Sequence, residues 1–120
     1  MMAKHNELGK KGEALAREFL ERKGYRIVEA NWHYDKDEID LIAWHGNTLV
    51  IVEVKTLSTD YFGAPEEAVD RNKESFLIRA TEAYLEEKDL DCESRFDIVA
   101  IVMNEKGTRI NHIEEAFFPE

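Results

Sequence analysis

Two acidic residues and a lysine stand on two neighbouring predicted strands and have the types needed for metal-assisted hydrolysis. Asp40 ends the acidic segment 37–40, and Glu53 and Lys55 lie in the next apolar run. Side chains alternate between the faces of a strand, so Glu53 and Lys55 share one face while the valines beside them occupy the other. Carboxylates bind hard divalent cations, and an ammonium group stabilises charge that develops on a phosphoryl group. The pattern therefore predicts a hydrolytic metal site.

The turn between these strands sets the pairing of the charged residues. We expect a two-residue turn at Gly46-Asn47, because Gly and Asn are favoured in tight hairpin turns. Counting back from it gives the pairs His45 with Thr48, Asp40 with Glu53, and Glu38 with Lys55. Like charges directly opposite each other destabilise a sheet. The acid pair therefore requires a compensating cation, which is either the Lys55 ammonium or a divalent metal.

A charged sheet face in contact with water explains the same pattern, and Glu38 with Lys55 would then be an ordinary surface ion pair. The flanking sequence favours the site. Apart from Glu53, the run from Leu49 to Val54 is wholly apolar, as in a strand that is covered on both faces. A carboxylate on a strand that is covered on both faces is costly to bury, so we interpret Glu53 as a functional residue.

The elements that must position these residues can be read from periodicity. We expect a helix that Asn6 caps and Gly24 ends, and a second helix from Ala64 to about Lys88. Apolar runs and turn residues predict five strands, at residues 25–32, 39–44, 49–56, 95–103 and 108–114. The order is αβββαββ in a single α/β domain over residues 1–120.

Both helices place functional candidates near this core. In the first helix Glu13 lies at the shoulder of the apolar stripe, from which an acid could join a site. Gly9 and Gly12 each cost about 1 kcal/mol of helix propensity, which predicts close approach of the backbone to a sheet or a ligand. Lys73 falls on the apolar face of the second helix, where its stem lies along the core edge or its ammonium reaches a site.

Composition limits the classes of partner. The chain has 120 residues, a hydrophobic fraction of 43% and a net charge of -10, which argues against a general nucleic-acid coat protein. Basic residues gather in the first helix and make it locally able to face phosphate. No run approaches the roughly 18 apolar residues of a membrane span, and no secretory signal opens the chain, so we expect a cytoplasmic protein with no membrane partner.

Several separate blocks resemble one family. They are Gly9-x-x-Gly12-Glu13-x-x-Ala16, Asn31, residues 38–43, Val52-Glu53-Val54-Lys55-Thr56, Phe62-Gly63-x-Pro65, Lys73 and Arg95-Phe96-Asp97. In this order they resemble the bacterial YraN-type family of endonuclease-like proteins, which is similar to the PD-(D/E)xK nuclease superfamily and to archaeal Holliday-junction resolvases. The resemblance covers nearly the whole chain.

The resemblance implies a restriction-endonuclease-like core, with a mixed central sheet of about five strands flanked by helices. It implies that Asp40 and Glu53 bind Mg²⁺ or Mn²⁺, with the Val54 carbonyl as a further ligand and Glu13 holding the metal or its water. Lys55 would then position the attacking water or neutralise the phosphoryl group. DNA is the expected partner, contacted by Lys10, Lys11, Arg17 and Lys73, and a homodimer is possible.

Two positions differ from the usual family pattern: Asp37 stands where glycine is usual, and Leu57 where arginine is usual. Both changes make the region less favourable for phosphate. The first hypothesis is a metal-dependent nuclease that acts on DNA, on branched or damaged intermediates. The alternatives are a non-catalytic nucleic-acid-binding or partner-scaffolding domain with the nuclease fold, and a structural acidic domain whose hairpin charges are solvated.

Overall fold

The computed structural model describes residues 2–58 and 70–118, with side chains from residue 7 onward, and has an α/β fold. Its elements follow the predicted order αβββαββ: α1 (Met2–Arg22), β1 (Arg26–Tyr34), β2 (Asp37–His45), β3 (Thr48–Leu57), α2 (Arg71–Glu87), β4 (Ser94–Asn104) and β5 (Gly107–Phe117). All five predicted strands are confirmed, and each runs slightly further at its C-terminal end than predicted.

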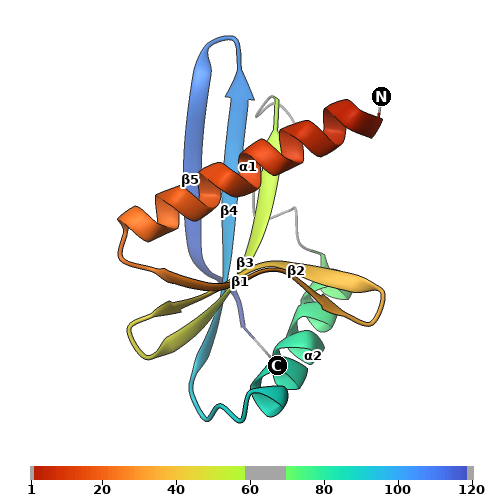
Figure 1. Cartoon of the computed structure of the whole chain (residues 1–120), viewed down its shortest axis with the longest axis vertical. Helices are drawn as coiled ribbons and strands as arrows, with labels where there is room; N and C mark the ends of the chain where they lie inside the picture. The colour runs from red at the N-terminus through yellow and green to blue at the C-terminus, as the bar shows by residue number, and fades with distance from the viewer. Residues whose placement is uncertain (1, 59–69, 119–120) are drawn as a thin grey trace.

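The strands form one sheet in the order β1-β2-β3-β4-β5. Neighbouring strands are antiparallel except β3 and β4, which are parallel. A parallel pair needs a crossover connection, and α2 lies within it. Figure 1 shows that the sheet is strongly twisted, because β1 and β2 run nearly across the direction of β4 and β5. This mixed sheet with two helices is consistent with the predicted restriction-endonuclease-like core.

The two helices cover opposite faces of the sheet. Ala16 and Leu20 of α1 belong to one buried cluster with Val50 and Val52. The cluster on the other face contains Phe76, Leu77, Ala80 and Tyr84 of α2, together with Leu49, Ile51, Phe96 and Ile98. Strands β3 and β4 are therefore covered on both sides, which explains why they read as continuous apolar runs.

Helix α1 ends as the sequence predicts. Gly24 has a φ of +92°, and its N–H donates to the Glu21 carbonyl at 3.1 Å, while the Tyr25 N–H donates to the Leu20 carbonyl at 3.0 Å. These two bonds form a Schellman motif, in which glycine supplies the left-handed backbone.

The predicted N-cap at Asn6 is wrong, because α1 begins at Met2 and Asn6 lies inside it. Ala3 and Lys4 have high helix propensity and extend the helix upstream.

Helix α2 begins later than predicted. Asp70 has an extended backbone, with φ -86° and ψ 179°, and its carboxylate accepts the Lys73 N–H at 2.9 Å. Asp70 is therefore the N-cap, and the predicted continuous helix from Ala64 is wrong because the backbone of Asp70 is extended and not helical. Residues 64–69 lie outside the described residues. The predicted end near Lys88 is confirmed, because Lys88 is the C-cap.

A buried ionic network fastens β4 to its neighbours. Asp97, whose side chain is fully buried, accepts both Arg95 Nε and Nη2 at 2.9 Å and His112 Nε2 at 2.7 Å. Burial raises the pKa of Asp97, but the hydrogen bonds from His112 and Arg95 outweigh burial and hold the pKa below its ordinary value. Arg95 also contacts the Tyr25 hydroxyl and His45, so the network joins β4 and β5 to the first hairpin.

None of the helices in the described part of the chain is long and apolar enough to cross a membrane.

We predict that Asp97→Ala lowers the free energy of unfolding by about 3–5 kcal/mol, because it removes the buried carboxylate that accepts hydrogen bonds from Arg95 and His112. Urea denaturation monitored by circular dichroism measures this change. Asp91→Ala, which removes an exposed carboxylate, is the matched control and should change stability by less than about 0.5 kcal/mol. Equal effects of the two substitutions would contradict the structural role of the network.

Candidate functional site

The candidate site forms where β2 and β3 separate. The two strands pair from His45 with Thr48 to Leu41 with Val52, which confirms the predicted turn, and Gly46 has a φ of +63°. Beyond this point β2 follows β1, whereas β3 follows the parallel β4 as far as Leu57. The twisted sheet therefore opens between β2 and β3.

The predicted pair of Glu38 with Lys55 is wrong, because the ladder between the strands has already ended. Glu38 instead pairs with His33 of β1, whose Nε2 lies 3.3 Å from Glu38 Oε2. Lys55 remains exposed on the final part of β3. The same opening between β2 and β3 gives access to Asp40 and Glu53.

Asp40 lies in the gap between the two strands. Its Oδ2 accepts the Val54 N–H at 2.8 Å, and this bond takes the place of a ladder bond between β2 and β3. Because backbone N–H groups of a strand lie in the plane of the sheet, the Asp40 carboxylate points along the sheet toward β3. From there it interacts with groups that belong to both faces.

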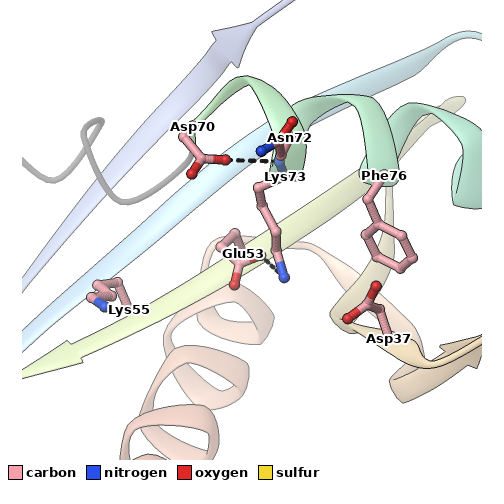
Figure 2. A pocket seen from close by; sticks show the side chains of 7 residues that line it. All are labelled: Asp37, Glu53, Lys55, Asp70, Asn72, Lys73 and Phe76. Carbon is pink, nitrogen blue, oxygen red and sulfur yellow. Dashed lines mark hydrogen bonds and ion pairs between the residues drawn. The ribbon is translucent and has the colours of Figure 1, made fainter.

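Glu53 lies on the α2 side of β3 and is the most perturbed acid of the site. Only 16% of its side chain is exposed, and its Oε2 atom is buried without a hydrogen bond. Lys73 Nζ lies 3.4 Å from this oxygen, as the dashed line in Figure 2 shows. Burial first, and then repulsion by Asp40, raise the pKa of Glu53 to about 8, although Lys73 opposes the shift. The predicted proximity of Asp40 and Glu53 is confirmed, but their predicted direct pairing is not, because the ladder ends at Leu41 with Val52.

Burial also raises the pKa of Asp40, and the Val54 N–H and Lys73 offset only part of this effect. The surroundings thus stabilise the ionised forms of both carboxylates incompletely.

A third and a fourth acid approach Asp40 from the α1 side. One carboxylate oxygen each of Glu13, Glu38 and Asp40 lies within 4.8 Å of the others. Asn31, which has a φ of +54° in β1, donates from Nδ2 to Glu13 Oε2 at 3.3 Å and holds this acid in place. Burial raises the pKa of Glu13, as do Asp40 and Glu38.

The sequence prediction of Glu13 as a neighbour of Asp40 is confirmed. The sequence did not predict Glu38 as a third acid of this group, because Glu38 was paired with Lys55. The alternation of Glu38 and Asp40 along one strand was a signal that could have found it.

Lys55 stands at the rim of two hollows. A pocket of about 430 Å³ on the α2 side is lined by three acids, two lysines and two further residues: Asp37, Glu53, Asp70, Lys55, Lys73, Asn72 and Phe76 (Figure 2). A hollow of about 220 Å³ beside α1 includes Glu13, Val54 and Lys55. Lys55 shares its face with Glu53, as predicted, but the cation that contacts Glu53 is Lys73.

The contact of Gly12 with Thr56 fixes α1 against β3. A Cβ atom at Gly12 would lie 1.8 Å from Thr56 Oγ1, so only glycine fits at this distance. The predicted close backbone approach is confirmed for Gly12. At Gly9 the predicted approach to the sheet is wrong, because nothing lies within 4 Å of an added Cβ atom, and the approach to a ligand stays a prediction.

The other predicted contact residues lie on α1, the helix that also carries Glu13. Lys10, Lys11 and Arg17 are exposed on α1, and Arg17 Nε lies 4.0 Å from Glu21 Oε2. The block Phe62-Gly63-x-Pro65 lies outside the described residues.

The donor set fits a hard divalent cation. All four acids offer oxygen ligands, which Mg²⁺ and Mn²⁺ prefer. The unbonded Glu53 Oε2 supplies an oxygen with free capacity. Among the described residues one ammonium, that of Lys73, forms an ion pair with Glu53. The Val54 carbonyl remains a predicted ligand.

Comparison with known proteins places the chain in a family. The model of "Uncharacterised protein family UPF0102" matches residues 12–101. The UPF0102 protein of Christiangramia forsetii is 54% identical over 117 residues, which span 98% of both chains. Those of Flavobacterium psychrophilum and Phocaeicola vulgatus are 50% and 46% identical, again over 98% of each chain. The chain belongs to the UPF0102 family. This is the YraN family that the sequence motifs resemble, and the UPF0102 match includes Glu13, Asp40, Glu53, Lys55 and Lys73.

We predict that the metal-free protein loses stability as pH rises from about 5 to about 8. A carboxyl group whose pKa is raised on folding binds its proton more tightly in the folded state, so the unfolded state ionises first and is favoured as pH rises. Glu53→Gln should remove roughly 2 kcal/mol of this loss. Urea unfolding in EDTA at pH 5 and pH 8 measures both chains. Parallel pH dependences would contradict the raised pKa of Glu53.

We also predict opposite effects for the same substitution at two positions of α1. Gly12→Ala should destabilise the protein by about 2 kcal/mol, because the new methyl group overlaps Thr56. Gly9→Ala should stabilise it by up to about 1 kcal/mol through helix propensity alone. Thermal unfolding measures both changes, and adding Thr56→Gly to Gly12→Ala should recover part of the loss. A stabilising Gly12→Ala would show that α1 can move away from β3.

Proposed function

We propose that this UPF0102 protein is a metal-dependent nuclease that hydrolyses phosphodiester bonds of DNA with Mg²⁺ or Mn²⁺. The observation that carries the proposal is the pair Asp40 and Glu53, held together and largely out of water beside an open pocket, with a buried Glu53 oxygen that no hydrogen bond occupies. Structural carboxylates are normally hydrogen-bonded or exposed. A buried carboxylate oxygen without a hydrogen bond is instead typical of a ligand site.

Each residue has a defined role in this proposal. Asp40 and Glu53 would hold the ion, with the Val54 carbonyl as a further ligand and Glu13 beside its water. The bound ion supplies an activated water and neutralises phosphate charge. Lys55, exposed at the rim of both hollows, would orient that water or stabilise the charge that develops on the phosphoryl group. The hydrogen bond from the Val54 N–H supports this role, because it holds the Asp40 carboxylate in one orientation.

The charge of the chain restricts the substrate. A net charge of -10 opposes binding to plain duplex, and the exposed cations Lys10, Lys11 and Arg17 offer few phosphate contacts. We therefore propose branched, flapped or single-stranded DNA, in which shape or a second subunit adds to binding.

A non-catalytic DNA-binding or partner-scaffolding domain is the second candidate. Asp37 and Asp70 line the pocket beside Glu53, so two further anions lie where a phosphate would enter. This acidity weakens phosphate binding and favours a domain that keeps the fold without turnover.

We predict that Mn²⁺ binds to one site in isothermal titration and that Asp40→Ala and Glu53→Ala abolish binding. Lys55→Ala should keep metal binding but lower cleavage about 100-fold or more, because it acts on water and phosphate. Labelled linear, flapped and four-way DNA at low salt measures cleavage, and Asp91→Ala is the control. Metal and DNA binding without cleavage of any substrate would favour the non-catalytic candidate. Absence of metal binding would refute the site.

A further inference from the structure

Lys73 is the cation that contacts the acid pair in the described part of the chain. Its Nζ lies 3.4 Å from Glu53 Oε2, and it favours the ionised forms of both Glu53 and Asp40. The side chain is 34% exposed, whereas that of Glu53 is 16% exposed. The Lys73 ammonium thus stabilises the ionised form of the acid pair, which burial disfavours.

The atom that Lys73 contacts is the atom with free ligand capacity. Glu53 Oε2 is buried and accepts no hydrogen bond, so the contact with Lys73 is mainly electrostatic. A divalent ion coordinated by this oxygen would stand about 2.1 Å from it. Two cations so close to one oxygen repel each other strongly, so the ammonium and the metal exclude each other there.

The Lys73 side chain has room to move its ammonium away from Glu53. Asp70 caps the backbone N–H of Lys73, and Nζ lies 5.6 Å from the centre of the Phe76 ring, so the base of the side chain is fixed while its end stands over an apolar surface. Figure 2 shows Lys73 extending from α2 along the wall of the pocket toward Glu53. The pocket volume of about 430 Å³ leaves room for the side chain to turn away from Glu53 without movement of α2.

We infer that Lys73 is the resting counter-cation of Glu53 and that the divalent ion replaces it when the site is loaded. This inference rests on the proposed metal-dependent function. Lys73 then competes with the metal and sets the concentration of free ion at which the site fills. The released ammonium faces the pocket that DNA phosphate would enter, so phosphate binding and metal binding favour each other through this one side chain.

The test compares Mn²⁺ binding by the full chain and two neutral variants. Lys73→Met removes the charge but keeps an apolar stem against Phe76, and Lys88→Met removes a charge from the far end of α2, where Lys88 Nζ lies 3.7 Å from Glu87 Oε2. We expect Lys73→Met to bind Mn²⁺ about tenfold more tightly than the unmodified chain in isothermal titration. Lys88→Met should stay within about twofold.

Thermal unfolding provides a second readout. In EDTA, Lys73→Met should melt below the unmodified chain because the acid pair has lost its cation, and the rise in Tm on adding Mn²⁺ should be larger for the variant. Lys73→Arg tests the opposite direction, because a guanidinium fork binds a carboxylate more firmly and should weaken Mn²⁺ binding. This variant decides the question if Lys73→Met does not fold.

Each outcome separates the inference from the proposed function. Unchanged or weaker Mn²⁺ binding by Lys73→Met, in a protein whose unmodified form binds Mn²⁺, overturns the exchange and leaves the metal site standing. No Mn²⁺ binding by any form overturns the metal site and the exchange together. Tighter binding by Lys73→Met with unchanged binding by Lys88→Met supports the exchange.

Discussion

The architecture around the site is governed by one electrostatic constraint, which is that two carboxylates are held side by side and largely out of water. Desolvation disfavours the ionised forms of Asp40 and Glu53, and repulsion by Asp40 adds to this effect at Glu53. The Val54 N–H and the Lys73 ammonium offset part of this penalty.

The fold meets this constraint by opening its sheet at one point. Strand β2 stays with β1 while β3 stays with β4, and the gap places Asp40 between the two faces. Glu13 reaches it from the α1 side, and Glu53 from the α2 side. On β4, Asp97 pairs with Val52, the residue before Glu53. Its carboxylate differs from that of Glu53, because both oxygens of Asp97 are hydrogen-bonded. The hydrogen bonds of Asp97 stabilise the sheet, whereas Glu53 Oε2 accepts no hydrogen bond.

The sequence predicts most of this arrangement because local signals determine it. The turn at Gly46 and the strict alternation of β3 are sufficient to bring Asp40 to Glu53. The departure of β2 from β3 was not predictable, since it depends on how each strand pairs with its outer neighbour, and it removed the expected contact of Glu38 with Lys55. The role of Lys73 depends on the packing of α2, and periodicity alone does not distinguish a lysine that snorkels from one that reaches an acid.

The order in which the chain is synthesised gives the position of Lys73 a further consequence. All four acids lie within the first 53 residues, on elements joined by short local connections that can pair early. Lys73 and the parallel partner β4 leave the ribosome later, and until then β3 has an open edge and an uncovered face. Docking of α2 and β4 therefore closes the aggregation-prone edge of β3 and neutralises the acid pair in the same stage of folding.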